Sequence, residues 1–134
     1  MPDRPNDPTV LIYDEIEWDD VLRTAKVGTA PPKELVAQAK KKGARRKKLA
    51  RGEGGFFMNR SVLPPGFRVP PHHHDHDELM IVLAGGCTFD DGVATLGPDD
   101  SIVIQARFRY GFTCGDAGME FLTIRRGEAA MSVE

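Results

Sequence analysis

The stretch GFRVPPHHHDHDELMIVLAGG, from Gly66 to Gly86, decides the fold and the function that this sequence predicts. It holds all four histidines of the 134-residue chain. Side chains two residues apart on an extended strand point to the same side, so His72 and His74 are expected to project together and His73 to point away. Glu78 then opens the next apolar run.

Two imidazoles and one carboxylate that converge on one point form a typical divalent-metal site. The predicted ligands are His72, His74 and Glu78, and three protein ligands leave positions open for water or a substrate. Two nitrogens and one oxygen suit Fe2+, Mn2+, Ni2+, Co2+ or Zn2+, whereas Ca2+ requires oxygen ligands.

The residues between the histidine pair and Glu78 are polar. His73, Asp75, His76 and Asp77 are predicted to form a solvated turn. The alternative is that some of them hydrogen-bond to the metal ligands and orient them.

Length, charge and cysteine content limit the number of domains, the kinds of partner and the cellular compartment that the sequence allows. A chain of 134 residues with a formal net charge of −2 predicts one domain whose overall field attracts neither nucleic acid nor membrane. The amino-terminal stretch is acidic and lacks the basic flank and apolar core of a secretion signal. Cys87 and Cys114 fit neither a metal-binding spacing nor a disulfide framework. We therefore expect a cytoplasmic protein with reduced thiols.

From Phe56 onward the sequence is typical of an all-β protein. Short apolar segments recur at roughly ten-residue spacing, with glycine, proline and aspartate between them. The segments are FFMNRSVL, ELMIVLAGGCTF, VATLG, SIVIQARF, YGFTC and MEFLTIRR. This rhythm predicts a sandwich or barrel of antiparallel strands.

The preceding residues predict an arm, a helix and a hairpin. TVLIYD (9–14) is expected to form a short strand, and PPKELVAQAKKKG (31–43) a helix that starts at Pro32 and stops at Gly43. ARRKKLA and FFMNRSVL are expected to be two strands joined by the glycine-bearing turn RGEGG. The predicted organisation is an arm with a short helix (1–43), a barrel (44–128) and a tail (129–134).

Residues 33–51 hold nine of the eighteen basic residues. Such a run could contact phosphates. However, it contains no interleaved aromatic residues for base stacking, and alternating charges protect an exposed edge strand from aggregation. Pairing with the acidic arm is equally natural, so the sequence disfavours nucleic-acid binding.

Five positions in the opening stretch resemble the first motif of the cupin superfamily. In this sequence they are Gly66, His72, His74, Glu78 and Gly85, and every spacing of the motif is met. Shifting the register to another histidine breaks the pattern. The resemblance covers about residues 45–126 and implies an all-β fold, a cupin-type β-barrel or jelly roll of antiparallel strands with an N-terminal arm and one short helix.

The second cupin motif is only half present. GPDDSIVI, from Gly97, resembles its opening, but Gln105, Arg107 and Tyr110 stand where the family has proline, glycine and a metal-binding histidine. Some cupin lyases and cyclases place a tyrosine at or near the metal. Tyr110 is therefore either a metal ligand or general acid/base, or a residue that fills the barrel. Both interpretations stay open.

The same strand parity predicts which neighbours of Tyr110 point into the barrel and which point outward. Phe112 and Cys114 are expected to pack inside the barrel with it. Arg107 and Arg109 have the opposite parity and are expected to face solvent or a partner chain.

The resemblance also implies a function. It suggests a metal-dependent enzyme acting on a small carbonyl, enol, carboxylate or aromatic compound, as a dioxygenase or a lyase or isomerase. The implied metal is Fe2+ first, or Mn2+, Zn2+ or Ni2+, held by His72, His74, Glu78 and Tyr110, with Glu78 and Tyr110 as candidate catalytic residues. The alternative is a non-catalytic cupin that binds a metal or small ligand as a sensor or partner-binding protein. A homodimer and no membrane association are expected.

Overall fold

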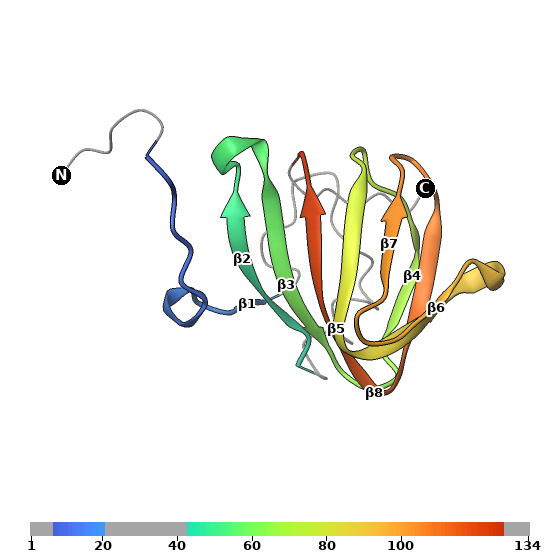
Figure 1. Cartoon of the computed structure of the whole chain (residues 1–134). Helices are drawn as coiled ribbons and strands as arrows, with labels where there is room; N and C mark the ends of the chain where they lie inside the picture. The colour runs from blue at the N-terminus through green and yellow to red at the C-terminus, as the bar shows by residue number, and fades with distance from the viewer. Residues whose placement is uncertain (1–6, 21–42, 128–134) are drawn as a thin grey trace.

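The computed structural model describes residues 7–20 and 43–127. These ranges form one antiparallel sheet of eight strands with three single-turn 3₁₀ helices, and this confirms the predicted all-β jelly roll (Figure 1). The strands are β1 (Asp19–Asp20), β2 (Arg45–Arg51), β3 (Phe57–Leu63), β4 (Arg68–His72), β5 (Glu78–Phe89), β6 (Thr95–Leu96), β7 (Ser101–Ile104) and β8 (Tyr110–Arg125). The 3₁₀ turns are η1 (Tyr13–Glu15), η2 (Glu53–Gly55) and η3 (Asp90–Gly92).

The two longest strands, β5 and β8, form the spine of the sheet (Figure 1). The first half of β5 pairs with the end of β8 and with β7, and its second half pairs with the start of β8 and with β6. The register of β5 against β8 shifts after Val82 and again after Gly85, and such bulges bend a strand. β3 pairs with the end of β8 and β4 with its start. Each long strand therefore runs along both walls of the curved sheet.

Two glycines explain the bend. Gly85 and Gly118 both have left-handed backbones, with φ of +70° and +73°. A side chain at Gly85 would collide with the Gly118 carbonyl, and one at Gly118 would lie 2.5 Å from the carbonyl oxygen of Leu63. Only glycine allows this approach. The second glycine of the cupin-like motif is thus required by the packing of the strands.

Strand alternation builds the core. In β5, Met80 and Val82 are buried while their neighbours are partly exposed, as expected for one face turned inward. Each fully buried large side chain contributes about 1.5–3 kcal/mol. The other core residues include Leu63, Phe67, Val69, Cys87, Phe89, Ile104, Phe112, Cys114, Met119 and Phe121. The prediction that Phe112 and Cys114 face inward is confirmed.

Several predicted strands match closely and others do not. The β2–β3 hairpin forms with its turn at RGEGG, and the bounds of β5 match the predicted segment. YGFTC and MEFLTIRR, expected as separate strands, run on as the single strand β8, because both continue to pair with β5 across the register shift. β4 was not predicted as a strand of its own.

The predicted strand at residues 9–14 is wrong. Residues 9–12 have no strand partner, and Tyr13 begins the turn η1. Val10, Leu11 and Ile12 stay exposed on an extended segment that reaches away from the sheet, drawn in blue in Figure 1. The short strand β1 follows and pairs with β2. The helix predicted at 31–43 and the tail at 129–134 fall on residues outside the described ranges, apart from Gly43.

The arm packs against the basic strand β2. Asp19 and Asp20 are register partners of Arg46 and Arg45. Lys47 is buried beneath the arm, where its amine donates a 2.9 Å hydrogen bond to a backbone carbonyl and lies 3.7 Å from the centre of the Tyr13 ring. Part of the basic run therefore packs on aromatic residues of the same chain and pairs with the acidic strand β1.

Residues 7–20 and 43–127 include no helix with the length and apolar character needed to cross a membrane.

Candidate metal centre

Four side chains meet inside the sheet because their strands begin or end there. His72 closes β4 and is the register partner of Tyr110, the first residue of β8. Glu78 opens β5 and is the register partner of Arg125, the last residue of β8. All four are buried. The sheet pairing thus brings together residues that are up to 53 positions apart, from 72 to 125.

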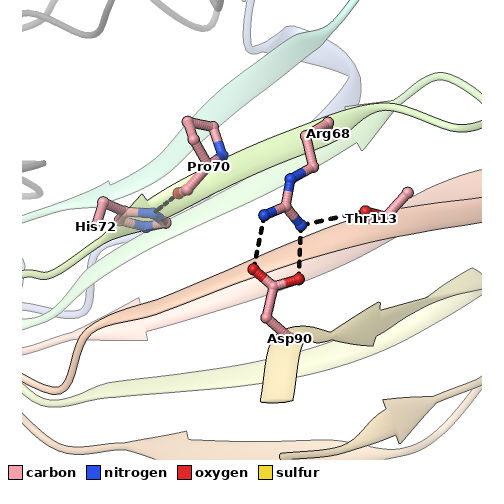
Figure 2. A network of polar contacts seen from close by, with 5 residues as sticks. All are labelled: Arg68, Pro70, His72, Asp90 and Thr113. Carbon is pink, nitrogen blue, oxygen red and sulfur yellow. Dashed lines mark hydrogen bonds and ion pairs between the residues drawn. The ribbon is translucent and has the colours of Figure 1, made fainter. Parts of the chain in front are cut away.

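His72 is held with one ring nitrogen turned away from the centre. Its Nδ1 lies 2.8 Å from the Pro70 carbonyl oxygen, which can only accept a hydrogen bond, so Nδ1 carries the proton (Figure 2). Burial lowers the pKa of His72 to about 4, although the contact with Pro70 acts in the opposite direction. The imidazole is therefore neutral at pH 7, and Nε2 keeps the lone pair that a metal needs.

His74 lies beside His72, as the sequence predicted. The two ring centres are 4.9 Å apart, and Nε2 of His74 is 3.8 Å from Oε2 of Glu78. Backbone and side-chain contacts anchor the loop that carries it. The amide of Arg107 donates to the His74 carbonyl at 2.7 Å, and the amide of Ala106 donates to Oδ1 of Asp77 at 2.8 Å.

Tyr110 points into the same cluster. Its hydroxyl donates a 3.4 Å hydrogen bond to Oε1 of Glu78, and its ring lies 4.4 Å from the His72 ring, centre to centre. Burial, together with the charge of Glu78, holds the pKa of Tyr110 well above its ordinary value. The tyrosine that replaces the motif histidine is therefore a protonated phenol within reach of Glu78.

Sequence reasoning missed Arg125. Its guanidinium forms an ion pair with Oε2 of Glu78, and the side chain is only 8% exposed. The signal was present in strand parity. Phe121, Thr123 and Arg125 alternate along β8, and all three are buried. A charged residue in phase with core residues is expected inside the barrel.

The other polar residues of the loop lie outside the cluster. Asp75, His76 and Asp77 are exposed, which agrees with the predicted solvated turn, whereas His73, predicted to belong to the same turn, is half-buried. The His76 ring lies against Gly127, where any side chain would collide with it. Asp77 also lies 3.9 Å from Arg126 in an exposed ion pair.

The two predicted outward-facing arginines, Arg107 and Arg109, are exposed. Arg107 adopts a left-handed backbone with φ of 69° at the turn after β7. The motif glycine that this arginine replaces would adopt such a conformation without strain.

A bidentate ion pair supports β4 next to the cluster (Figure 2). The guanidinium of Arg68 binds both carboxylate oxygens of Asp90 at 2.7 and 2.6 Å and also donates to Thr113 at 3.2 Å. Gly111 lies next to this ion pair and to β4. A side chain at position 111 would come within 3.0 Å of Asp90 and of the β4 backbone, so the position requires glycine. This network fixes η3 and β8 against the strand that ends at His72.

The donor chemistry fits a divalent transition metal, but the present arrangement does not. Among the described residues, no group of three or more His, Cys, Asp or Glu side chains is placed to hold a metal ion. In the present arrangement the carboxylate of Glu78 is paired with the guanidinium of Arg125. Binding a metal through His72, His74 and Glu78 therefore requires Glu78 to release or share its contact with Arg125.

Comparisons with known proteins agree with the fold and the motif. The chain is similar to the structure of KdgF from Halomonas sp. (18% identity, 91% of this chain and 96% of that chain, TM-score 0.65) and to an RmlC-like cupin from Shewanella frigidimarina (17%, 91% and 94%, 0.62). It is also similar to the polyketide cyclase RemF from Streptomyces resistomycificus (20%, 95% and 85%, 0.66). No curated protein matches it significantly.

These structural likenesses lie below 25% identity and establish the fold alone. The sequence model of the cupin domain matches residues 59–125, half of the chain, and spans His72, His74, Glu78, Tyr110 and Arg125. This protein is a member of the cupin family.

Proposed function

We propose that this cupin is a metal-dependent enzyme that acts on a small organic substrate inside the barrel. The observation that carries the proposal is the convergence of four side chains, of which His72, Glu78 and Tyr110 are buried and His74 is partly buried beside them. The neutral imidazole of His72 offers Nε2 and Glu78 offers its carboxylate oxygens as candidate metal ligands, and His74 lies beside both. A divalent metal bound there would act as a Lewis acid on a substrate oxygen, and iron would also permit chemistry with dioxygen.

The chain's own residues supply acid–base chemistry. Glu78 is a buried carboxylate that can take a proton from a substrate carbon or hydroxyl. Tyr110 is a neutral phenol next to it and can return a proton to a developing oxyanion. The rings of Phe89 and Phe112 contact Tyr110, at centre-to-centre distances of 5.8 and 6.4 Å, and provide apolar walls. This lining favours a substrate with an apolar or aromatic body and one polar group.

Two assays separate the candidate reactions. Lyase, isomerase or cyclase chemistry begins with abstraction of a proton from carbon. Small carbonyl compounds and carboxylic acids should therefore exchange carbon-bound hydrogen for deuterium in D2O when protein loaded with Zn2+ or Mn2+ is present. The cyclase among the similar structures makes this the first assay to perform. Dioxygenase chemistry should instead consume oxygen with Fe2+-loaded protein. Glu78→Gln should abolish either signal, and if neither appears in the wild type, the enzyme proposal is wrong.

A non-catalytic metal- or ligand-binding cupin is the second candidate. Two observations favour it: Arg125 already neutralises Glu78, and Tyr110 replaces the fourth ligand that the family motif supplies. A sensor or partner-binding protein would bind a small ligand reversibly and leave it unchanged. Recovery of every panel compound intact after long incubation, together with saturable binding, would support this alternative.

We also propose that the chain forms a homodimer through its arm. Val10, Leu11 and Ile12 are 73%, 38% and 50% exposed, and a second copy could cover them. Light scattering of the full chain should give twice the monomer mass, and replacing the three residues with serine should give the monomer mass. A monomeric wild type would contradict the proposal.

A further inference from the structure

Arg125 has an unusual environment for an arginine. It is 8% exposed and lies at the end of β8, between β5, where Glu78 is its register partner, and β3, where Phe57 is. Its side chain extends into the candidate metal centre and meets Oε2 of Glu78. A buried guanidinium needs a counter-charge, and Glu78 supplies it.

The pairing between Arg125 and Glu78 is incomplete. A guanidinium and a carboxylate can form two parallel hydrogen bonds, but Oε1 of Glu78 instead accepts the hydroxyl of Tyr110 at 3.4 Å. Among the described residues, Nε of Arg125 has no hydrogen-bond partner. One edge of a buried, charged donor group is therefore available for an acceptor from a ligand.

The charge balance changes if Glu78 becomes a metal ligand. Glu78 and Arg125 neutralise each other, and neither His72 nor His74 adds a negative charge. A divalent cation and one guanidinium would face a single carboxylate, leaving an excess of positive charge in a water-poor site. Such a site selects a ligand that brings negative charge of its own.

We propose that Arg125 is the anion anchor of this site and that the ligand is a small carboxylic acid with an apolar or aromatic body. The ligand carboxylate offers Arg125 two coplanar oxygens, a match to the guanidinium that Glu78 does not complete here. The inference deepens the proposed function and rests on it, because a metal must first draw Glu78 away from Arg125.

The test uses the full chain with benzoate as the probe and benzamide as its uncharged counterpart. Mn2+ binding is measured first, without probe, by electron paramagnetic resonance of the free ion. Benzoate and benzamide are then titrated calorimetrically into metal-free and Mn2+-loaded protein. The variants are Arg125→Gln and Arg125→Lys, and the matched control is Arg126→Gln on the exposed neighbour.

Benzoate should bind the Mn2+-loaded wild type more tightly than the metal-free protein, and more tightly than benzamide binds. Arg125→Gln should weaken benzoate binding by about tenfold or more, and Arg126→Gln should leave it unchanged. Arg125→Gln should also tighten Mn2+ binding, because no guanidinium then competes for Glu78. Arg125→Lys keeps a positive charge beside Glu78 and should therefore fold even if Arg125→Gln does not. It should bind benzoate less tightly than the wild type, because lysine lacks the planar guanidinium.

Two failures can be told apart. A wild type that binds no Mn2+ overturns the proposed metal site, and this inference with it. If the wild type binds Mn2+ but Arg125→Lys and Arg126→Gln bind benzoate equally tightly, the inference alone is overturned. Arg125 is then only a counter-charge to Glu78.

Discussion

Gly85 on β5 and Gly118 on β8 approach so closely that no side chain fits between them. A methyl group on Gly85 would collide with the carbonyl group of Gly118, and both residues have positive φ. The contact lies where the register of β5 against β8 shifts. The corner of the sheet thus depends on two glycines that lie far apart in the sequence.

Replacing Gly85 should be far more damaging than replacing a glycine with the same backbone conformation in open space. Gly66 has φ of +68°, and nothing lies within 4 Å of its missing side chain, so it is a matched control. We expect Gly66→Ala to cost about 1–2 kcal/mol of unfolding free energy from backbone strain alone. Gly85→Ala adds a backbone collision and should cost several times as much or prevent folding. Equal urea midpoints for the two variants would contradict this account of the corner.

The Arg68–Asp90 pair predicts a pH-dependent contribution to stability. The hydrogen bond from Arg68 lowers the pKa of Asp90 in the folded protein. A carboxyl group whose pKa is lower folded than unfolded stabilises the fold above its unfolded pKa of about 3.9, and this contribution disappears as the pH falls through the folded value. The wild type should therefore be more stable than Asp90→Asn at pH 7, with the difference closing below about pH 4. Urea unfolding across this range measures it. In an Arg68→Gln background the difference should be largely absent, and its persistence there would exclude the pair as its cause.

Cys87 and Cys114 should be chemically inert in the folded protein. They are register partners on β5 and β8 and are both buried free thiols. Burial raises the pKa of Cys87 to about 11 and that of Cys114 to about 12, so neither forms appreciable thiolate at pH 8. Iodoacetamide should label the native chain slowly at pH 8 and both cysteines rapidly in urea, as followed by mass spectrometry. Rapid labelling of the native chain would show that this part of the barrel opens.

Tyr110 should support metal binding through Glu78. Tyr110→Phe removes the hydroxyl that holds Oε1 of Glu78 and should weaken Mn2+ binding by about tenfold. Tyr110→His supplies the imidazole of the family motif and should restore or exceed the wild-type affinity. Phe112→Leu is the control, because Phe112 packs on the rings of Tyr110 and Phe89 and has no polar atom to hold Glu78; this change should have little effect on Mn2+ binding. Unchanged affinity in Tyr110→Phe would mean that the tyrosine only fills the barrel.

The sequence predicted those parts of the molecule that short-range patterns encode. The apolar run ELMIVLAGGCTF, bounded by polar turn residues, predicted β5, and the spacing of His72, His74 and Glu78 placed three candidate site residues within seven positions. These features depend on strand parity and on neighbours along the chain.

The missed features depend on contacts between distant residues. Arg125 reaches the site only because β8 pairs with β5 along its whole length. The apolar run 9–12 has the composition of a strand, but it finds no strand partner within the described chain. Burial of Lys47 likewise requires Tyr13, which lies 34 residues earlier in the chain. Local propensity does not show which distant segment will pack against a given strand.

The central claim is that His72, His74 and Glu78 hold a divalent metal despite the Arg125 pair. The most direct test is the metal content of untagged protein, produced in medium containing iron, manganese, zinc and nickel and measured by mass spectrometry beside a His72→Ala, His74→Ala double variant. We predict about one metal per wild-type chain, as expected for a site with three protein ligands, and none in the variant. An empty wild-type chain, or equal metal in both proteins, would contradict the claim and favour a barrel in which Arg125 permanently neutralises Glu78.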